Sequence, residues 1–244
     1  MKIVFGKWTE DKLDRIISEA SDFKTAGARI EFLSAQFLGT QYKGDTLIGN
    51  EDTEEELVIN LGGVDCFTFI DYIEAMRLSK SLAEFKDNVR KVRYRSGNIS
   101  YESRNHFFTD WREFNSGLVE DVTDKISAGR SKYIRKTLNR RDGGTYFLPG
   151  IPCREREVAY IPSESVDAAL IESLRTGDYA GIYSENKGLD VSHVGIIIKD
   201  GDRTLLRHAS SSANNRKVVD EDFRKYIAGK PGIVLLKPKN SLQV

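Results

Sequence analysis

The sequence is poor in cysteine and has no long apolar run, and these two absences exclude several classes of protein. Its 244 residues include only 2 cysteines, Cys66 and Cys153. Two cysteines so far apart make neither the disulfide framework of a small secreted domain nor the close ligand spacing of a zinc knuckle. Because no run reaches about 18 apolar residues, we expect no transmembrane helix. The apolar stretch at the start is also too short for a signal peptide.

The sequence also lacks an excess of charge of either sign. Lys+Arg and Asp+Glu both number 37, so the formal net charge is zero. Proteins that bind nucleic acid usually carry a basic excess, and we therefore expect no nucleic-acid partner. The hydrophobic content of 39% and charged content of 30% are typical of a globular domain. With no internal repeat, low-complexity tract or linker, we expect a single domain over residues 1–244. A monomer is the expected oligomeric state.

Hydrophobic periodicity divides the chain into a helical part and a β-rich part. Apolar residues at helical spacing predict N-terminal helices within residues 9–39 and a further helix over 65–78. Residues 81–160 read as a mainly helical insertion. The β-rich part covers 176–240, with a helix expected near 218–229. Helices followed by antiparallel strands predict the α+β class.

One cysteine falls where the sequence predicts the start of a helix. In the stretch "NLGGVDCFTFIDYIEAM", Gly62 and Gly63 permit a sharp turn, Asp65 is a good N-cap, and Cys66 follows on the first turn. A helix N-terminus favours a thiolate because it presents free N–H groups and a positive dipole end. Cysteine is also among the most frequently buried residues, so a packing role for Cys66 is the alternative until a base is found.

Two of the three histidines flank a predicted β-hairpin. Asp200-Gly201, between "SHVGIII" and "TLLRHAS", is a strong two-residue turn signal. With these two residues as the loop, His193 lies directly opposite His208. Directly opposed residues share a face of the sheet, with Cβ atoms about 4.5–5.5 Å apart. A three-residue loop would instead place the two rings on opposite faces.

A pair of neighbouring imidazoles is suited to activating a thiol. One ring can accept the thiol proton while the other fixes the tautomer and orientation of the first. The plainer alternative is that each histidine is a half-buried residue at a strand end. A third alternative is a zinc site with Cys66, His193 and His208 as ligands. No HExxH motif or close Cys/His spacing supports it, so we expect no metal and no cofactor.

Three motifs together, "VDCFTFID", "SHVGIII" and "LRHASS", resemble those of the NlpC-type papain-like peptidoglycan hydrolases. The sequence is more similar to a divergent branch, the N-acetylmuramoyl-L-alanine amidase-like family. That branch has Asp-Cys-x-Thr-Phe in place of Asp-Cys-Ser-Gly and a segment like "RNHFFTDW" between the cysteine and the histidine. The resemblance extends from "LGTQY" near residue 38 to "RHASS" near residue 212. It implies a papain-like core, in which helices pack on an antiparallel sheet.

The resemblance also implies roles for individual residues. Cys66 would be the nucleophile, His193 the general base and His208 the orienting third member. The hydroxyl of Tyr42 would help the Cys66 backbone N–H to stabilise an oxyanion, although Gln41 stands where the family leads us to expect proline. Core packing for Trp111 and capping for Asp110 are the alternatives to a substrate role. The expected substrate contacts are Asp65, Thr68, Arg104, Asn105, His106, Asp110, Trp111 and Ser192.

The activity implied is hydrolysis, through a thioester, of the amide between N-acetylmuramic acid and L-alanine. Small muropeptides, with a reducing or an anhydro sugar, are the expected substrates and partners, because the sequence shows no wall-binding repeat. An endopeptidase that cuts γ-D-glutamyl-diamino acid bonds is the nearest alternative, and a non-catalytic muropeptide-binding protein is the other. The substrate class implies the periplasm or cell envelope if a leader has been removed, and the cytoplasm otherwise.

Overall fold

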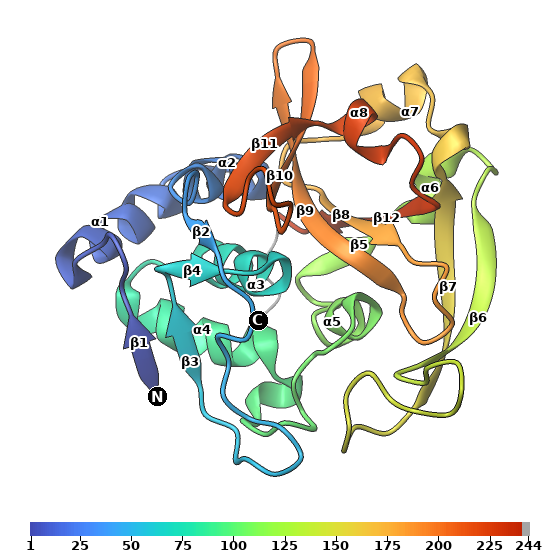
Figure 1. Ribbon diagram of the computed structural model, residues 1–244. Helices are drawn as coiled ribbons and strands as arrows, with labels where there is room; N and C mark the ends of the chain where they lie inside the picture. The colour runs from blue at the N-terminus through green and yellow to red at the C-terminus, as the bar shows by residue number, and fades with distance from the viewer. Residues whose placement is uncertain (241–244) are drawn as a thin grey trace.

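The computed structural model describes residues 1–240 and contains one large antiparallel sheet beside a group of helices (Figure 1). The N-terminal helices, blue to teal in Figure 1, gather on one side, and the strands of the C-terminal half form the other. The α+β class expected from the sequence is therefore confirmed. Within residues 1–240, no helix has the length and apolar character needed to cross a membrane.

The helices begin where the sequence places good capping residues. The side chains of Thr9, Thr25 and Asp65 each accept a hydrogen bond from the first turn of the helix that follows. The first two helices lie within the predicted 9–39, and the third matches the predicted 65–78 to within a residue. The helices are α1 (Glu10–Ser21), α2 (Ala26–Ala35), α3 (Cys66–Arg77), α4 (Leu82–Arg93), α5 (Phe108–Phe114), α6 (Thr123–Ser127), α7 (Ala168–Ser173) and α8 (Phe223–Ile227).

The large sheet has the strand order β11-β10-β9-β8-β12-β7-β6. The short strand β5 also pairs with β12 but lies outside this linear order. Two short parallel pairs, β1–β3 and β2–β4, lie near the N-terminal helices. The strands are β1 (Lys2–Val4), β2 (Gln41–Tyr42), β3 (Val58–Asn60), β4 (Gly63–Val64), β5 (Val119–Asp121), β6 (Lys132–Leu138), β7 (Arg154–Pro162), β8 (Tyr179–Tyr183), β9 (Val191–Asp200), β10 (Arg203–Ala209), β11 (Val218–Asp222) and β12 (Gly232–Pro238).

Residues 81–160 are not mainly helical, contrary to the expectation. They contain α4 and α5, but β6 and β7 form a long hairpin that joins the main sheet through β12. The first four residues of β6, 132–135, are all exposed, as at the edge of a sheet. A strand that is exposed on both faces has no alternation of apolar and polar residues. The sequence of β6 therefore gave no signal that predicts a strand.

The segment near 218–229 is also only partly helical. Its first half is the edge strand β11, and its second half is the short helix α8. Asp222 marks the change, because its carboxylate accepts a hydrogen bond from the Lys225 backbone N–H. The expected helix is therefore correct for 223–227 and wrong for 218–222.

The β9–β10 turn begins one residue later than the sequence suggested. Asp200 pairs with Arg203, so Gly201 and Asp202 form the two-residue loop. Gly201 has a φ of +57°, a conformation that glycine adopts without strain. Glycine is favoured at the first position of such loops, which explains why the loop starts at the glycine rather than before it.

This later turn shifts the register of the two histidines by two residues. Arg207 pairs with Ile196, which places His208 opposite Gly195 rather than directly opposite His193. The expected direct pairing is therefore wrong. A shift of two residues keeps both side chains on one face, because side chains alternate with a period of two. His193 and His208 are diagonal neighbours on that face, still within reach of each other.

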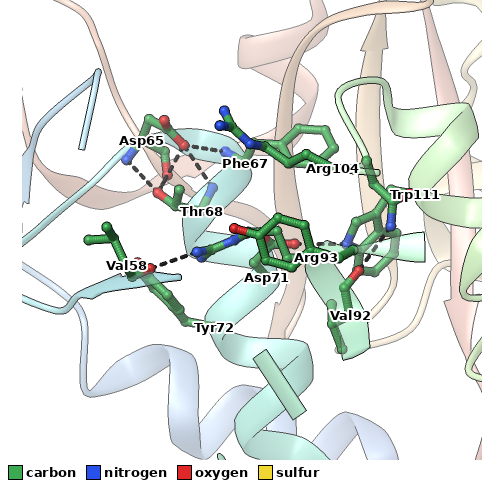
Figure 2. Close-up of polar contacts among 12 residues, drawn as sticks. Val58, Asp65, Phe67, Thr68, Asp71, Tyr72, Val92, Arg93, Arg104 and Trp111 are labelled. Atoms are coloured by element: carbon green, nitrogen blue, oxygen red, sulfur yellow. Dashed lines mark hydrogen bonds and ion pairs between the residues drawn. The ribbon is translucent and has the colours of Figure 1, made fainter. Parts of the chain in front are cut away.

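Helix α3 lies in the centre of the core and carries a buried ion pair. The Arg93 guanidinium donates to the Asp71 carboxylate, with Nε to Oδ2 at 2.8 Å, and to the Val58 carbonyl at 2.6 Å (Figure 2). The Trp111 indole N–H donates to the other Asp71 oxygen at 3.0 Å. Burial raises the pKa of Asp71, and the Arg93 charge opposes that effect. The pair thus joins α3 to α4 and α5.

Replacing Arg93 by alanine leaves the buried Asp71 without its counter-charge. We expect Arg93→Ala to lower the free energy of unfolding by about 3–5 kcal/mol, as the loss of one partner of a buried pair does. Urea unfolding followed by circular dichroism measures this change. The control is Lys91→Ala, because Lys91 pairs with Asp87 at the surface, and its loss costs at most about 1 kcal/mol. Equal effects for the two variants would contradict the assigned role of the buried pair.

Candidate active site

The start of α3 is held by a reciprocal capping box. One Asp65 carboxylate oxygen accepts hydrogen bonds from the Phe67 and Thr68 backbone N–H groups at 2.9 and 2.7 Å. The Thr68 hydroxyl in turn accepts from the Asp65 backbone N–H at 3.0 Å (Figure 2). Both side chains, which the resemblance placed among the substrate contacts, are thus engaged in fixing the first turn, and with it the position of Cys66.

The two glycines before Asp65 provide close packing rather than a left-handed turn. Neither Gly62 nor Gly63 has a positive φ. A Cβ on Gly63 would lie 2.8 Å from the Lys43 Cβ, which no ordinary contact tolerates. Gly63 therefore allows the segment around Tyr42 to run beside β4, and Tyr42 pairs with Val64 there.

The thiol of Cys66 is uncharged in the resting protein. Burial raises its pKa to about 12, and the nearby Asp65 carboxylate raises it further. The backbone amides of Val194, Cys66 and Phe67 act in the opposite direction. The amides lower the pKa of the thiol by less than burial raises it. The thiol therefore requires a base to become a nucleophile.

His193 and His208 form a hydrogen-bonded pair on one face of the sheet. The His193 Nε2 lies 2.7 Å from the His208 Nδ1, with the ring planes perpendicular. Burial lowers the pKa of His193 to about 3, with smaller contributions from His208 and from Lys230. His193 is thus neutral across the physiological range and able to accept a proton. Because the two nitrogens face each other, the rings do not present them jointly to a metal ion.

Sequence reasoning missed two residues behind this pair. The Glu221 Oε2 lies 3.6 Å from the His208 Nε2, and Asn215 donates to the other Glu221 oxygen at 2.7 Å. Burial lowers the pKa of His208, whereas the Glu221 charge raises it. The Tyr226 ring packs on His208, with ring centroids 4.9 Å apart. Reading 218–222 as a strand would have placed Glu221 on the same face as His208.

Two cavities meet at His193 and share it with Ser192. The first, the thiol pocket, has a volume of about 90 Å³ and is mostly apolar. Cys66, His106 and Phe108 are among its walls. The second, the serine cavity, has about 370 Å³ and lies on the side of Glu221, Tyr226 and Lys230. Its remaining walls include His208 and Ser210, Ser211 and Ser212.

Tyr42 lies close to the thiol. Burial raises the pKa of its hydroxyl, and the electrostatic effects of the Cys66 thiolate form and of Asp65 raise it further. The Arg216 guanidinium lies over the ring, 5.2 Å from its centroid, and acts in the opposite direction. The hydroxyl therefore keeps its proton and is available as a donor. Gln41, the departure from the family pattern, pairs with Gly63 and does not prevent this approach.

Several residues of the segment "RNHFFTDW" were expected to bind substrate, and one of them lines the thiol pocket. His106 lines the pocket, its Nε2 lies 2.7 Å from the Tyr101 carbonyl, and burial lowers its pKa to about 4. The indole of Trp111 is completely buried against Asp71, which is the core placement that formed the alternative. The Asn105 side chain is likewise buried and donates to the Val92 carbonyl at 3.0 Å.

The two charged residues of this segment form ion pairs within the protein. The Arg104 guanidinium donates to the Glu55 carboxylate, with Nε to Oε1 at 3.0 Å. Asp110 is buried on α5 and pairs with Arg156. Neither residue is among the walls of the thiol pocket or the serine cavity. Of the eight expected substrate contacts, Ser192 and His106 are those that border these cavities.

Comparison with solved structures finds the same architecture in two bacterial proteins. A protein from Legionella pneumophila superposes with a TM-score of 0.79, with 23% identity and 94% of each chain covered. An N-acetylmuramoyl-L-alanine amidase from Bacteroides uniformis superposes with a TM-score of 0.73, with 29% identity, 88% of this chain and 99% of that chain covered. No curated protein matches the sequence.

The family comparison covers most of the chain. The model of the N-acetylmuramoyl-L-alanine amidase-like family matches residues 32–233, a range that contains Cys66, both paired histidines and Glu221. The start of α3, the β9–β10 hairpin and both cavities fall within the same range. The chain belongs to the N-acetylmuramoyl-L-alanine amidase-like family.

Proposed function

We propose that this protein is a cysteine amidase that hydrolyses the bond between N-acetylmuramic acid and L-alanine in muropeptides. The observation that carries the proposal is the hydrogen-bonded pair of neutral imidazoles, His193 and His208, at a pocket that also contains the helix-start thiol of Cys66. Membership of the amidase-like family supports the same activity. A thiol at a helix start that packs against an antiparallel sheet also favours the papain-like relationship that the sequence implied.

The orientation of the histidines determines where the protons lie. The base must have a free lone pair, so we assign it to the His193 Nδ1, with the proton on Nε2. That proton is donated to the His208 Nδ1, which leaves the His208 proton on Nε2, directed at Glu221. In the first step His193 takes the Cys66 proton while the sulfur attacks the amide carbonyl carbon. The resulting imidazolium is stabilised through His208 by the Glu221 charge.

Two donors are available for the negative charge that develops on the carbonyl oxygen. One is the Cys66 backbone N–H at the first turn of α3, and the other is the Tyr42 hydroxyl, which its raised pKa keeps protonated. The C–N bond then breaks as His193 returns its proton to the leaving L-alanine nitrogen. The muramoyl lactyl group remains on the sulfur as a thioester. A water molecule, deprotonated by His193, releases it as a free acid and restores the thiol.

The two cavities on either side of His193 support a substrate that extends in both directions from the scissile bond. We propose soluble muropeptides, with either a reducing or an anhydro sugar, as that substrate. This substrate class favours the periplasm or cell envelope if a leader has been removed, and the cytoplasm otherwise. An endopeptidase acting within the stem peptide remains the rival activity, since the same residues would perform its chemistry.

Product analysis of one purified disaccharide–tetrapeptide tests the activity. We expect the wild-type protein to release the free disaccharide and a peptide that begins with L-alanine, as identified by mass spectrometry. Cys66→Ala should lower the rate by about 10⁴-fold or more, because the nucleophile is lost. Cys153→Ala is the matched control, since this free cysteine is absent from the walls of both cavities. A sugar–dipeptide product would instead support the endopeptidase, and undiminished turnover by Cys66→Ala would exclude the nucleophile assignment.

The pH dependence of kcat/KM tests the state of the base. Because the pKa of His193 is lowered to about 3, its imidazole stays neutral as the pH falls through the usual histidine range. We therefore expect kcat/KM to change less than about twofold between pH 5 and pH 7, where a histidine with an ordinary pKa of about 6.5 would lose most of its activity. Circular dichroism at each pH confirms that the protein stays folded. A loss centred near pH 6.5 would contradict the buried, neutral base.

Substitution of Glu221 tests the charge behind the histidine pair. The Glu221 carboxylate raises the pKa of His208, so Glu221→Gln should lower that pKa further, as measured by NMR titration of the imidazole. We expect kcat to fall by about tenfold with little change in KM, because the imidazolium forms only as the reaction proceeds. Glu120→Gln, an exposed carboxylate on β5, is the control. An unchanged His208 titration would show that Glu221 does not act on the pair.

A further inference from the structure

A third cavity, the basic cavity, lies where the β6–β7 loop meets the β8–β9 loop. Its volume is about 350 Å³, and five of its lining residues are cations. Its charged residues are Arg135, Lys136, Arg140, Arg141, Lys187 and one acid, Asp142. Asp142 is paired with Lys187 at 3.3 Å, and both side chains are exposed. The cavity therefore carries a local excess of positive charge in a protein whose net charge is zero.

Two of these cations have no ion-pair partner. Within residues 1–240, no carboxylate lies within 4.0 Å of the guanidinium of Arg140 or of Arg141. The Arg141 guanidinium lies over the Phe147 ring, 4.5 Å from its centroid. A guanidinium presents paired N–H donors that match the geometry of a carboxylate. The two guanidinium groups are thus available as donors to anionic oxygens.

Hydrogen bonds from β6 and the residue after it anchor the β8–β9 loop, which forms one wall of the basic cavity. The buried Lys136 ammonium donates to the carbonyls of Ser184 and of Asn186, the latter at 2.7 Å. The Asn139 backbone N–H donates to the Gly188 carbonyl at 2.9 Å. These contacts tie the start of the β6–β7 loop to the β8–β9 loop, and Figure 1 shows the two loops side by side at one end of the sheet. The β8–β9 side of the cavity is therefore anchored, while residues 140–144 of the β6–β7 loop are exposed.

The same β8–β9 loop leads directly into the thiol pocket. Lys187 lines the basic cavity, and Leu189, two residues later, lines the pocket that contains Cys66 and His193. Two residues of extended chain span at most about 7 Å. The β8–β9 loop therefore contributes neighbouring residues to the walls of both cavities.

We propose that the basic cavity binds the carboxylates of the stem peptide, with Arg140 and Arg141 as the contacting groups. This inference rests on the proposed function, in which the stem peptide is the leaving group. In a stem linked through the γ-carboxyl of D-glutamate, the α-carboxylate stays free, and the diamino acid and the chain end carry further carboxylates. Their charges match the two unpaired guanidinium groups. The cavity thereby selects acidic stem peptides over those in which the carboxylates are amidated.

The test compares binding and turnover for peptides that differ only in charge. Calorimetry measures binding of the free stem tetrapeptide to Cys66→Ala protein, in its acidic and its amidated form. We expect the acidic form to bind about tenfold more tightly, with a preference that weakens as the salt concentration rises. Introducing Arg140→Gln and Arg141→Gln together should remove this preference. With catalytically active protein, the same double substitution should raise KM for the acidic disaccharide–tetrapeptide about tenfold and leave kcat unchanged.

The control is the double variant Lys12→Gln and Lys24→Gln, which removes two exposed cations at the N-terminal helices and should leave the preference intact. Turnover of N-acetylmuramoyl-L-alanine amide, which carries no stem carboxylate, should be unaffected in both double variants. Equal binding of acidic and amidated peptides would overturn the inference, even if the amidase activity is confirmed. A retained charge preference without amide hydrolysis would uphold the basic cavity and refute the proposed activity.

Discussion

The burial of α3 between the helical layer and the sheet is the constraint on which the geometry of the site depends. The helix is joined to α4 and α5 through the Asp71–Arg93 pair and the Trp111 indole. A second buried pair, Glu74 with Arg77, receives the Tyr179 hydroxyl from β8. A buried charge without its partner is costly, so the Asp71–Arg93 pair permits few alternative positions of the helix. Glu74 and Arg77 both lie on α3, and the Tyr179 hydroxyl joins their pair to the sheet. The first turn, and with it Cys66, is thereby fixed against β9.

The same burial sets the electrostatics of the proposed reaction. It raises the pKa of the thiol and lowers that of the facing imidazole, so both groups are neutral before the substrate arrives. A resting thiolate–imidazolium pair would need stabilisation that this apolar pocket does not supply. In the proposed mechanism charge separation occurs when the sulfur attacks, where the helix-start amide, Tyr42 and the His208–Glu221 contact can offset it. Low dielectric strengthens each of these contacts.

The cavities divide the proposed recognition of substrate among different parts of the fold. The thiol pocket is small and apolar, the serine cavity carries hydroxyls and an aromatic ring, and the basic cavity carries guanidinium groups. All three touch the segment from Lys187 to His193, which runs from the β8–β9 loop into β9. In the proposed function, this one segment contacts three chemically distinct parts of the substrate. The β6–β7 hairpin, whose role the sequence did not reveal, supplies the cationic part.

The sequence by itself determined the features that depend on near neighbours in the chain. Local rules predict the cap at Asp65, the helix start at Cys66 and the shared face of His193 and His208. The shared face was predicted correctly although the register was wrong by two residues, because side chains along a strand alternate with a period of two. The tertiary structure decided what depends on distant segments: the burial of Trp111, the placement of Glu221 behind His208, and the meeting of Arg140 with the β8–β9 loop. The physical reason is that pairing between strands and packing of side chains are set by contacts across many residues, which no local pattern encodes.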